Sequence, residues 1–81
     1  MNNETRTVVN WLNKNPFAMA AAKTNLYRYH YEDWINGFVH ENMQRMLRCQ
    51  MNSTQLASDM LCAALEHVDW TIVREEVIKR A

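Results

Sequence analysis

Glycine and proline are nearly missing from this chain, which has one of each, Gly37 and Pro16, among 81 residues. Hairpins and small barrels need tight turns whose positive φ angles favour glycine, so a chain with one glycine is poorly suited to them. No segment alternates β-branched and polar residues as a half-buried strand does. An all-α fold is therefore predicted, as a single helical domain over residues 1–81.

Apolar side chains recur every three to four positions, as expected for helices that bury one face. The segments with this spacing are residues 4–14, 16–24, 31–48, 55–67 and 70–80, with residues 49–54 as a connector. Asn15 and Asp69 are predicted to cap the second and fifth helices, and Ser53 or Thr54 the fourth. The prediction is a compact single-domain bundle of four to five short helices. Its expected core side chains are Trp11, Leu12, Phe17, Trp34, Phe38, Leu61, Trp70 and Val73.

Three further expectations concern packing. Gly37 lies in the middle of the third helix, where glycine costs roughly 1 kcal/mol relative to alanine. It is either a weak point or a place where another helix comes close. The expected inner face of the second helix consists of Phe17, Ala20, Ala21 and Thr24. The expected inner stripe of the fourth consists of Leu56, Met60, Leu61, Ala64 and Val68, flanked by Ala57, Cys62 and Leu65.

The charges balance, with nine basic and nine acidic side chains. General nucleic-acid binders carry a basic excess that neutralises phosphates, and a whole-surface nucleic-acid mimic needs a large acidic excess. Direct nucleic-acid binding is therefore not expected. No apolar run approaches the ~18 residues of a membrane span, and no secretory signal pattern is found. We expect a protein of the cytoplasm, without membrane contact, whose Cys49 and Cys62 are free thiols; a disulfide between them is the alternative.

Residue spacing offers no recognisable catalytic or metal-binding motif. The three histidines are not at the H-x-x-x-H or H-E-x-x-H spacings that hold zinc. Adjacent carboxylates such as Glu32 and Asp33 point about 100° apart on a helix, so they do not face each other as an acid and a base. Cys62 lies in an apolar helix stripe and is expected to be inert packing. We expect no enzyme activity, no metal and no cofactor.

The most distinctive stretch is LYRYHYEDWINGF, residues 26–38. Its three tyrosines alternate with arginine and histidine, and such a run could stack on bases or contact a protein. In the alternative interpretation the run straddles a turn and the start of a helix, and one or two tyrosines enter the core. We expect Trp34 and Phe38 to be buried, and Tyr27 and Tyr29 to remain near the surface.

A wider pattern joins TVVNWLNKNPFAMAAA, YEDWINGFV and VDWTIVREEVI. A tryptophan-containing opening helix is followed by an Asn-led second helix, a Tyr-x-Asp-aromatic third helix and an Asp-led final helix. This pattern resembles a group of short proteins encoded by bacteriophages and related mobile elements. The chain departs from it before the fourth helix, where Asn52-Ser53-Thr54-Gln55 replaces a Thr-Pro-Asp-Gly type turn. The resemblance implies a setting in which small proteins block a host machine by direct contact, as anti-CRISPR and anti-restriction proteins do.

The leading prediction is a phage or mobile-element protein that binds and inhibits a host defence complex by protein–protein contact. Its partner would be a host protein or a protein–nucleic-acid complex, whose basic grooves could accept acidic side chains. The predicted contact residues are Tyr27, Tyr29, Glu32, Asp33, Asn36 and Glu41. One alternative is a DNA-binding regulator using the last two helices, although the final helix exposes the mixed set Thr71, Arg74, Glu75 and Lys79. Another is a homo-oligomeric assembly subunit, such as a homodimer, with a methionine-rich and aromatic face.

Overall fold

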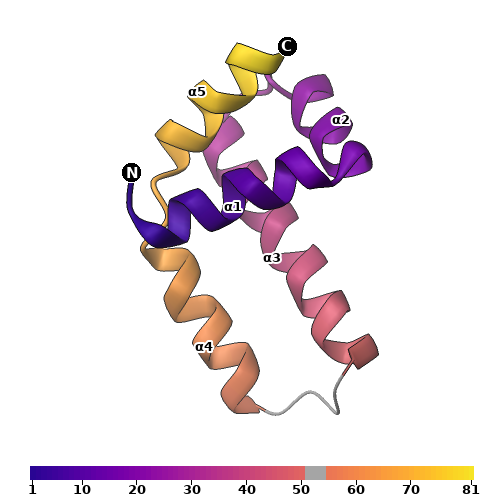
Figure 1. The fold of residues 1–81 in the computed structure, drawn as a ribbon, viewed down its shortest axis with the longest axis vertical. Helices are drawn as coiled ribbons and strands as arrows, with labels where there is room; N and C mark the ends of the chain where they lie inside the picture. The colour runs from indigo at the N-terminus through magenta and orange to yellow at the C-terminus, as the bar shows by residue number, and fades with distance from the viewer. Residues whose placement is uncertain (51–54) are drawn as a thin grey trace.

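The fold is a set of five helices, in a computed structural model that describes residues 1–50 and 55–81, without the side chains of residues 47–50 and 55–58 (Figure 1). The helices are α1 (Asn3–Lys14), α2 (Pro16–Thr24), α3 (Tyr31–Gln50), α4 (Gln55–Glu66) and α5 (Trp70–Arg80). No strand occurs in the described residues, so the all-α prediction is confirmed. The expected cap at Ser53 or Thr54, and the part of the connector at residues 51–54, lie outside the described residues.

Three of the helices begin at a residue whose side chain accepts a backbone N–H. Asn2 accepts from Thr5 at 2.8 Å, and Asn15 accepts from Ala18 at 3.2 Å. Asp69 accepts from two N–H groups in the first turn of α5. The predicted caps Asn15 and Asp69 are confirmed, and Asn2 is a further one. Each such cap is worth about 1 kcal/mol, which helps helices as short as these to form.

The helices pack around α1 and α3. Figure 1 shows α1 lying across α3, with α2 and α5 on one side of it and α4 on the other. Contacts join α1 to α2 and α5, α3 to α4 and α5, and α2 to α5. The molecule measures 36 × 23 × 23 Å. Its long axis reflects α3, because the 20 residues of that helix span about 30 Å.

The core is built from aliphatic side chains rather than aromatic ones. Leu12, Ile35, Val39, Val73 and Val77 are each 1% exposed or less. Trp11, Trp34, Phe38, Leu61 and Trp70 pack against this core but are only partly buried. Large rings between short helices leave an edge in solvent. Leu12 and Val73 are therefore confirmed as core residues, whereas Trp34 and Phe38 are half-buried, with their rings stacked at a centroid distance of 5.2 Å.

One buried polar side chain links the start of α1 to the start of α5. Thr5 is 0% exposed, and its Oγ1 accepts the backbone N–H of Asp69 at 2.8 Å. Beside it, Asn2 Nδ2 donates to the backbone carbonyl of His67 at 2.6 Å. Two bonds thus connect residues more than 60 positions apart in sequence. The Thr5 hydroxyl stays satisfied although it is out of reach of water.

The expected inner face of α2 is wrong. Phe17 is 89% exposed, and Ala20 and Thr24 are exposed, whereas Ala18 and Ala22 are buried. Ala22 is 0% exposed, and its backbone carbonyl accepts a hydrogen bond from the Tyr31 hydroxyl at 3.1 Å. Packing this close leaves room for alanine but not for phenylalanine, so the helix turns its larger side chain outward.

The inner stripe of α4 is wrong in part. Met60 is 63% exposed and Ala64 is exposed, whereas Leu65 and Val68 are buried at 8% each. α4 packs mainly on α3, so a narrower strip of its surface is covered than the spacing indicates. Gly37 is no site of close helix approach, because nothing lies within 4 Å of an added Cβ. The other alternative, that Gly37 is a weak point of α3, stays a prediction.

Candidate functional site

The loop between α2 and α3 presents aromatic side chains to solvent. Its ends are held by Leu26 and Tyr31, which are 3% and 4% exposed. Between them lie residues 27–30, all exposed, which we call the tyrosine turn. Arg28 N donates to Asn25 O at 3.0 Å, which closes the chain on itself. Two buried anchors with four residues between them therefore leave the intervening side chains in solvent.

His30 completes this turn in an unusual conformation. Its φ angle is 55°, in the left-handed region that non-glycine residues enter at a cost on the order of 1 kcal/mol. Its carbonyl accepts the N–H of Trp34 at 3.1 Å, so α3 begins directly after it. The ring of Tyr29 lies against the His30 imidazole, with a centroid distance of 4.0 Å. Strained residues persist where their surroundings hold them, and they concentrate at functional sites.

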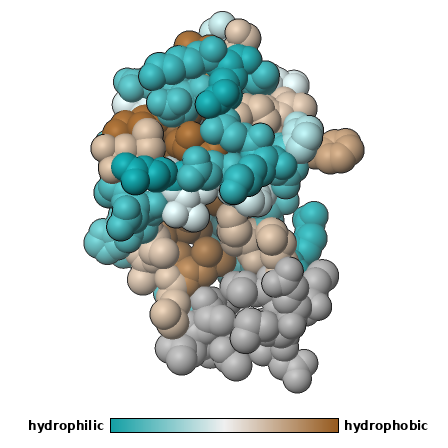
Figure 2. Space-filling view, in the orientation of Figure 1, coloured by the Kyte–Doolittle hydropathy of each residue, from teal (hydrophilic) through white to brown (hydrophobic). Residues whose placement is uncertain are grey.

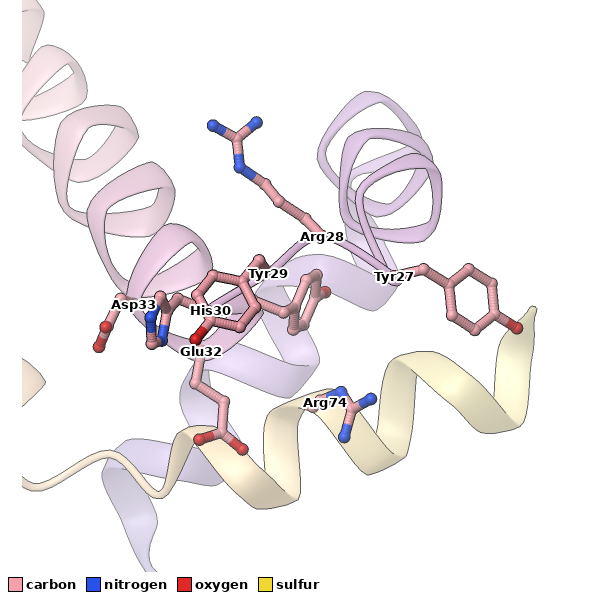
Figure 3. Close-up of a pocket in the computed structure, with 8 residues that line it drawn as sticks. Tyr27, Arg28, Tyr29, His30, Glu32, Asp33 and Arg74 are labelled. Atoms are coloured by element: carbon pink, nitrogen blue, oxygen red, sulfur yellow. The ribbon is translucent and has the colours of Figure 1, made fainter.

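The tyrosine turn and α5 enclose a surface cavity of about 420 Å³. In Figure 3 Arg74 lies on α5 below the turn, with Glu32 to its left and the ring of Tyr27 directed away from it to the right. Arg28 points away from α5 in the same view. The residues that line the cavity are Tyr27, Arg28, Tyr29, His30, Tyr31, Glu32, Asp33 and Arg74. The site therefore combines a loop, the first turn of α3 and the middle of α5.

Some of the side chains that line this cavity are held by hydrogen bonds, and others are not. Glu32 Oε1 accepts from Thr71 Oγ1 at 3.0 Å, which ties α3 to α5. Burial raises the pKa of Tyr31 to about 12, an effect that the nearby Arg74 charge partly opposes. Tyr31 therefore stays neutral and donates to Ala22 O. Arg74 also lines the cavity, and its guanidinium forms no hydrogen bond or ion pair with the side chains that the structure describes.

Four of the six predicted contact residues meet in this cavity: Tyr27, Tyr29, Glu32 and Asp33. Tyr27 and Tyr29 are 93% and 85% exposed, which confirms their expected surface position. Asn36 instead lines a smaller hollow between α3 and α4, and Glu41 is exposed further along α3. The residue missing from the prediction is Arg74. Its exposure on the last helix was expected, but its position beside the turn depends on how α5 packs.

The predicted packing of Cys62 within an apolar helix stripe is wrong. The thiol is free and exposed, so it forms no disulfide with Cys49, whose own side chain lies outside the described set. Cys62 lines the hollow of about 210 Å³ that includes Asn36, together with His40, Leu65 and Glu66. α4 turns this cysteine toward α3 and solvent rather than into the core.

No family model matches the chain, and the comparisons with curated proteins and with solved structures give no match. Among the described helices, none has the length and apolar character that crossing a membrane requires. In the same residues, no three His, Cys, Asp or Glu side chains are grouped to hold a metal ion. A function therefore has to be inferred from the tyrosine turn and its cavity.

Proposed function

We propose that this protein acts by binding another protein, with the tyrosine turn and the adjoining cavity as its contact surface. The observation that carries the proposal is the exposure of Tyr27 and Tyr29, 93% and 85%, beside an arginine with free donors. Tyrosine and arginine are over-represented among the residues that dominate binding energy. They combine a large contact area with hydrogen bonding, and tyrosine does so with few rotatable bonds.

The cavity suits a side chain or short segment of a partner. Arg74 offers planar donors that match a carboxylate or a carbonyl group, and Tyr27, which also lines the cavity, adds an exposed aromatic ring. Charges of both signs surround the opening, with Arg28 and Arg74 opposed by Glu32 and Asp33. Such a mixture fits a folded protein surface better than a row of phosphates. This geometry favours aromatic and arginine anchors over the acidic contacts that the sequence suggested.

The proposed partner is a bacterial defence complex of the CRISPR or restriction type, which the protein would inhibit in the host cytoplasm. Support comes from the phage-like sequence pattern of the first, third and last helices. Binding at this surface would act by covering part of the host complex or by blocking its movement.

Purified defence complexes provide the test. The protein is titrated into DNA-cleavage assays of CRISPR effectors and restriction enzymes, and plaque counts are taken on hosts that carry each system. Inhibition is expected with the native chain and should fall at least about tenfold in a Tyr27→Ala/Tyr29→Ala variant, since hot-spot tyrosines are worth about 2 kcal/mol or more. Phe17→Ala is the matched control, because this aromatic residue is 89% exposed but does not line the cavity. Unchanged cleavage and plaque counts across these systems would sink the proposal.

Self-association is the alternative with a specific observation behind it. An apolar hollow of about 220 Å³ lies between α1, α3 and α4, and Figure 2 shows hydrophobic residues below the hydrophilic surface of α1. Val8, Val39, Met43, Leu61, Leu65 and Val68 contribute its apolar lining. Light scattering over a range of concentrations distinguishes this alternative, because a constant monomer mass excludes it.

The DNA-binding alternative has less support. The exposed face of α5 carries a mixture of charges, and Lys79 Nζ pairs with Glu76 at 3.2 Å. A recognition helix needs basic and amide side chains that face the groove. A gel shift at low salt with random duplex DNA distinguishes a DNA-binding regulator from a protein-binding inhibitor. A DNA complex whose amount falls steeply as salt is added would favour the regulator.

A further inference from the structure

A thiol and an imidazole meet on the surface between α3 and α4. Cys62 Sγ lies 3.3 Å from His40 Nε2, although the two residues are 22 positions apart in sequence. Cys62 is exposed and His40 is half-buried. The pair opens into the hollow of about 210 Å³, so a small molecule can reach the sulfur. This region is separate from the tyrosine turn.

A third residue orients the imidazole. Gln44, one helical turn beyond His40, places its amide Nε2 at 3.2 Å from the same His40 Nε2. An amide NH₂ group donates and cannot accept, so with the amide oriented in this way His40 Nε2 presents its lone pair. The thiol proton of Cys62 then points to that lone pair as well. The Cys62 thiol and the Gln44 amide are therefore each within hydrogen-bond distance of the same His40 nitrogen, which is the candidate base for the thiol.

We propose that Cys62 is a site of mixed-disulfide formation with small disulfides that carry ammonium groups and no carboxylates, and that His40 is its proton acceptor. Cys62 Sγ attacks one sulfur of the disulfide RSSR while its proton passes to His40 Nε2. The Cys62–S–S–R bond forms, the original S–S bond breaks, and the leaving thiolate takes up the proton as RSH. The Cys62 sulfur is oxidised and the leaving sulfur is reduced, so no further oxidant is needed.

The lining of the hollow indicates which disulfide fits. Asn36 supplies an amide for hydrogen bonds, and Glu66 supplies a carboxylate that can receive an ammonium group. Leu65 gives an apolar floor. The Glu66 carboxylate in this lining disfavours anionic reagents. A disulfide that carries ammonium groups and no carboxylates, such as cystamine, matches this environment.

The test uses a Cys49→Ser background, in which Cys62 is the remaining thiol. The rate of reaction with the neutral reagent 4,4′-dithiodipyridine is followed by absorbance at neutral pH, and the adduct with cystamine is located by peptide mass mapping. The folded protein is expected to react at least about tenfold faster than the same protein in guanidinium chloride, because a positioned base contributes about that much or more. A folded rate equal to or below the denatured rate would overturn the proposal.

Variants separate the role of His40 from general accessibility. His40→Gln should slow the folded protein about tenfold or more while circular dichroism keeps the same helix signal. Glu41→Gln, next to it on the exposed side of α3, should leave the rate unchanged. Equal rates for native His40 and His40→Gln would remove the proton-acceptor role. If His40→Gln does not fold, the folded-to-denatured ratio of the His40-containing protein still decides the outcome.

Discussion

The starts of α3 and α5 are both helix N-termini that follow a short loop, yet they are held in different ways. At α5, Asp69 has extended backbone angles and caps two N–H groups, and Thr5 accepts its own N–H. At α3, His30 has a φ of 55° and contributes its carbonyl to Trp34. The start of α3 is held instead by the burial of Tyr31 and its bond to Ala22.

The α5 start therefore has the features of a stable helix start, whereas the α3 start lacks some of them. The α5 start follows the local rules for helix caps, and Val68 and Thr5 beside it are buried. The α3 start breaks them and carries two almost fully exposed tyrosines. Natural proteins tend to violate local rules where function requires it and to compensate elsewhere. The contrast therefore agrees with a binding role for the tyrosine turn.

Alkaline pH should give the largest effect, and it acts on the α3 start. The pKa of Tyr31 rises from 10.0 to about 12 on folding. At lower pH both states keep the proton and the fold keeps its full stability. Between these two values the unfolded chain loses the proton first, so the free energy of unfolding falls as pH rises. The total loss should be at most about 2 to 3 kcal/mol, measured by urea unfolding across this range.

The control for that experiment is Tyr31→Phe, which keeps the ring but has no ionisable hydroxyl. At neutral pH it should be about 1 kcal/mol less stable, because the bond to the Ala22 carbonyl is lost. Its stability should then fall less steeply with pH than that of the native chain. Equal slopes for the two proteins would mean that Tyr31 does not hold the α3 start in this way.

Thr5→Val tests the α5 start. Valine keeps the shape of threonine but lacks the oxygen that accepts the Asp69 N–H, so a loss of about 2 kcal/mol is expected. Thr5→Ser keeps the hydroxyl and should lose about 1 kcal/mol, for one missing methyl group. Thermal and urea unfolding measure both changes. A serine variant less stable than the valine variant would contradict the importance of this bond.

Gly37→Ala tests the middle of α3, away from both helix starts. An added Cβ meets nothing within 4 Å, so the variant gains helix propensity without a clash. The free energy of unfolding should rise by about 0.5 to 1 kcal/mol. Calorimetry should show a higher melting temperature than that of the native chain. A lower melting temperature would indicate a contact on this face of α3 that the fold does not reveal.

The smallest change in the free energy of unfolding is expected when glycine replaces His30 at the α3 start or Asp69 at the α5 start. His30→Gly removes the cost of a left-handed non-glycine residue, offset in part by the greater freedom of glycine when unfolded. A gain of about 0.5 kcal/mol should remain. Asp69→Gly should instead lower stability, because a cap with two bonds is lost. Changes of the same sign in urea unfolding would show that the two starts do not differ as described.

Much of the fold was accessible from local patterns in the chain. Scarce glycine predicted helices, and Asn15, Pro16 and Asp69 marked two helix starts because a cap acts on N–H groups two or three residues away. The exposure of Tyr27 and Tyr29 was also predicted. The inward face of α2 was not. Alanines occupy several faces of α2, so the spacing of apolar residues does not indicate which face of the helix meets a neighbour.

Contacts between distant segments required the assembled molecule. Arg74 reaches the tyrosine turn because α5 packs beside α3, and His40 meets Cys62 because α4 runs back along α3. Helix formation depends on neighbours within about four residues, and the sequence records those directly. The side chains that meet across helices depend on small rotations and shifts that many residues share. For this reason the amino acids alone specified the helices of this protein, whereas packing placed Arg74 and the Cys62–His40 pair.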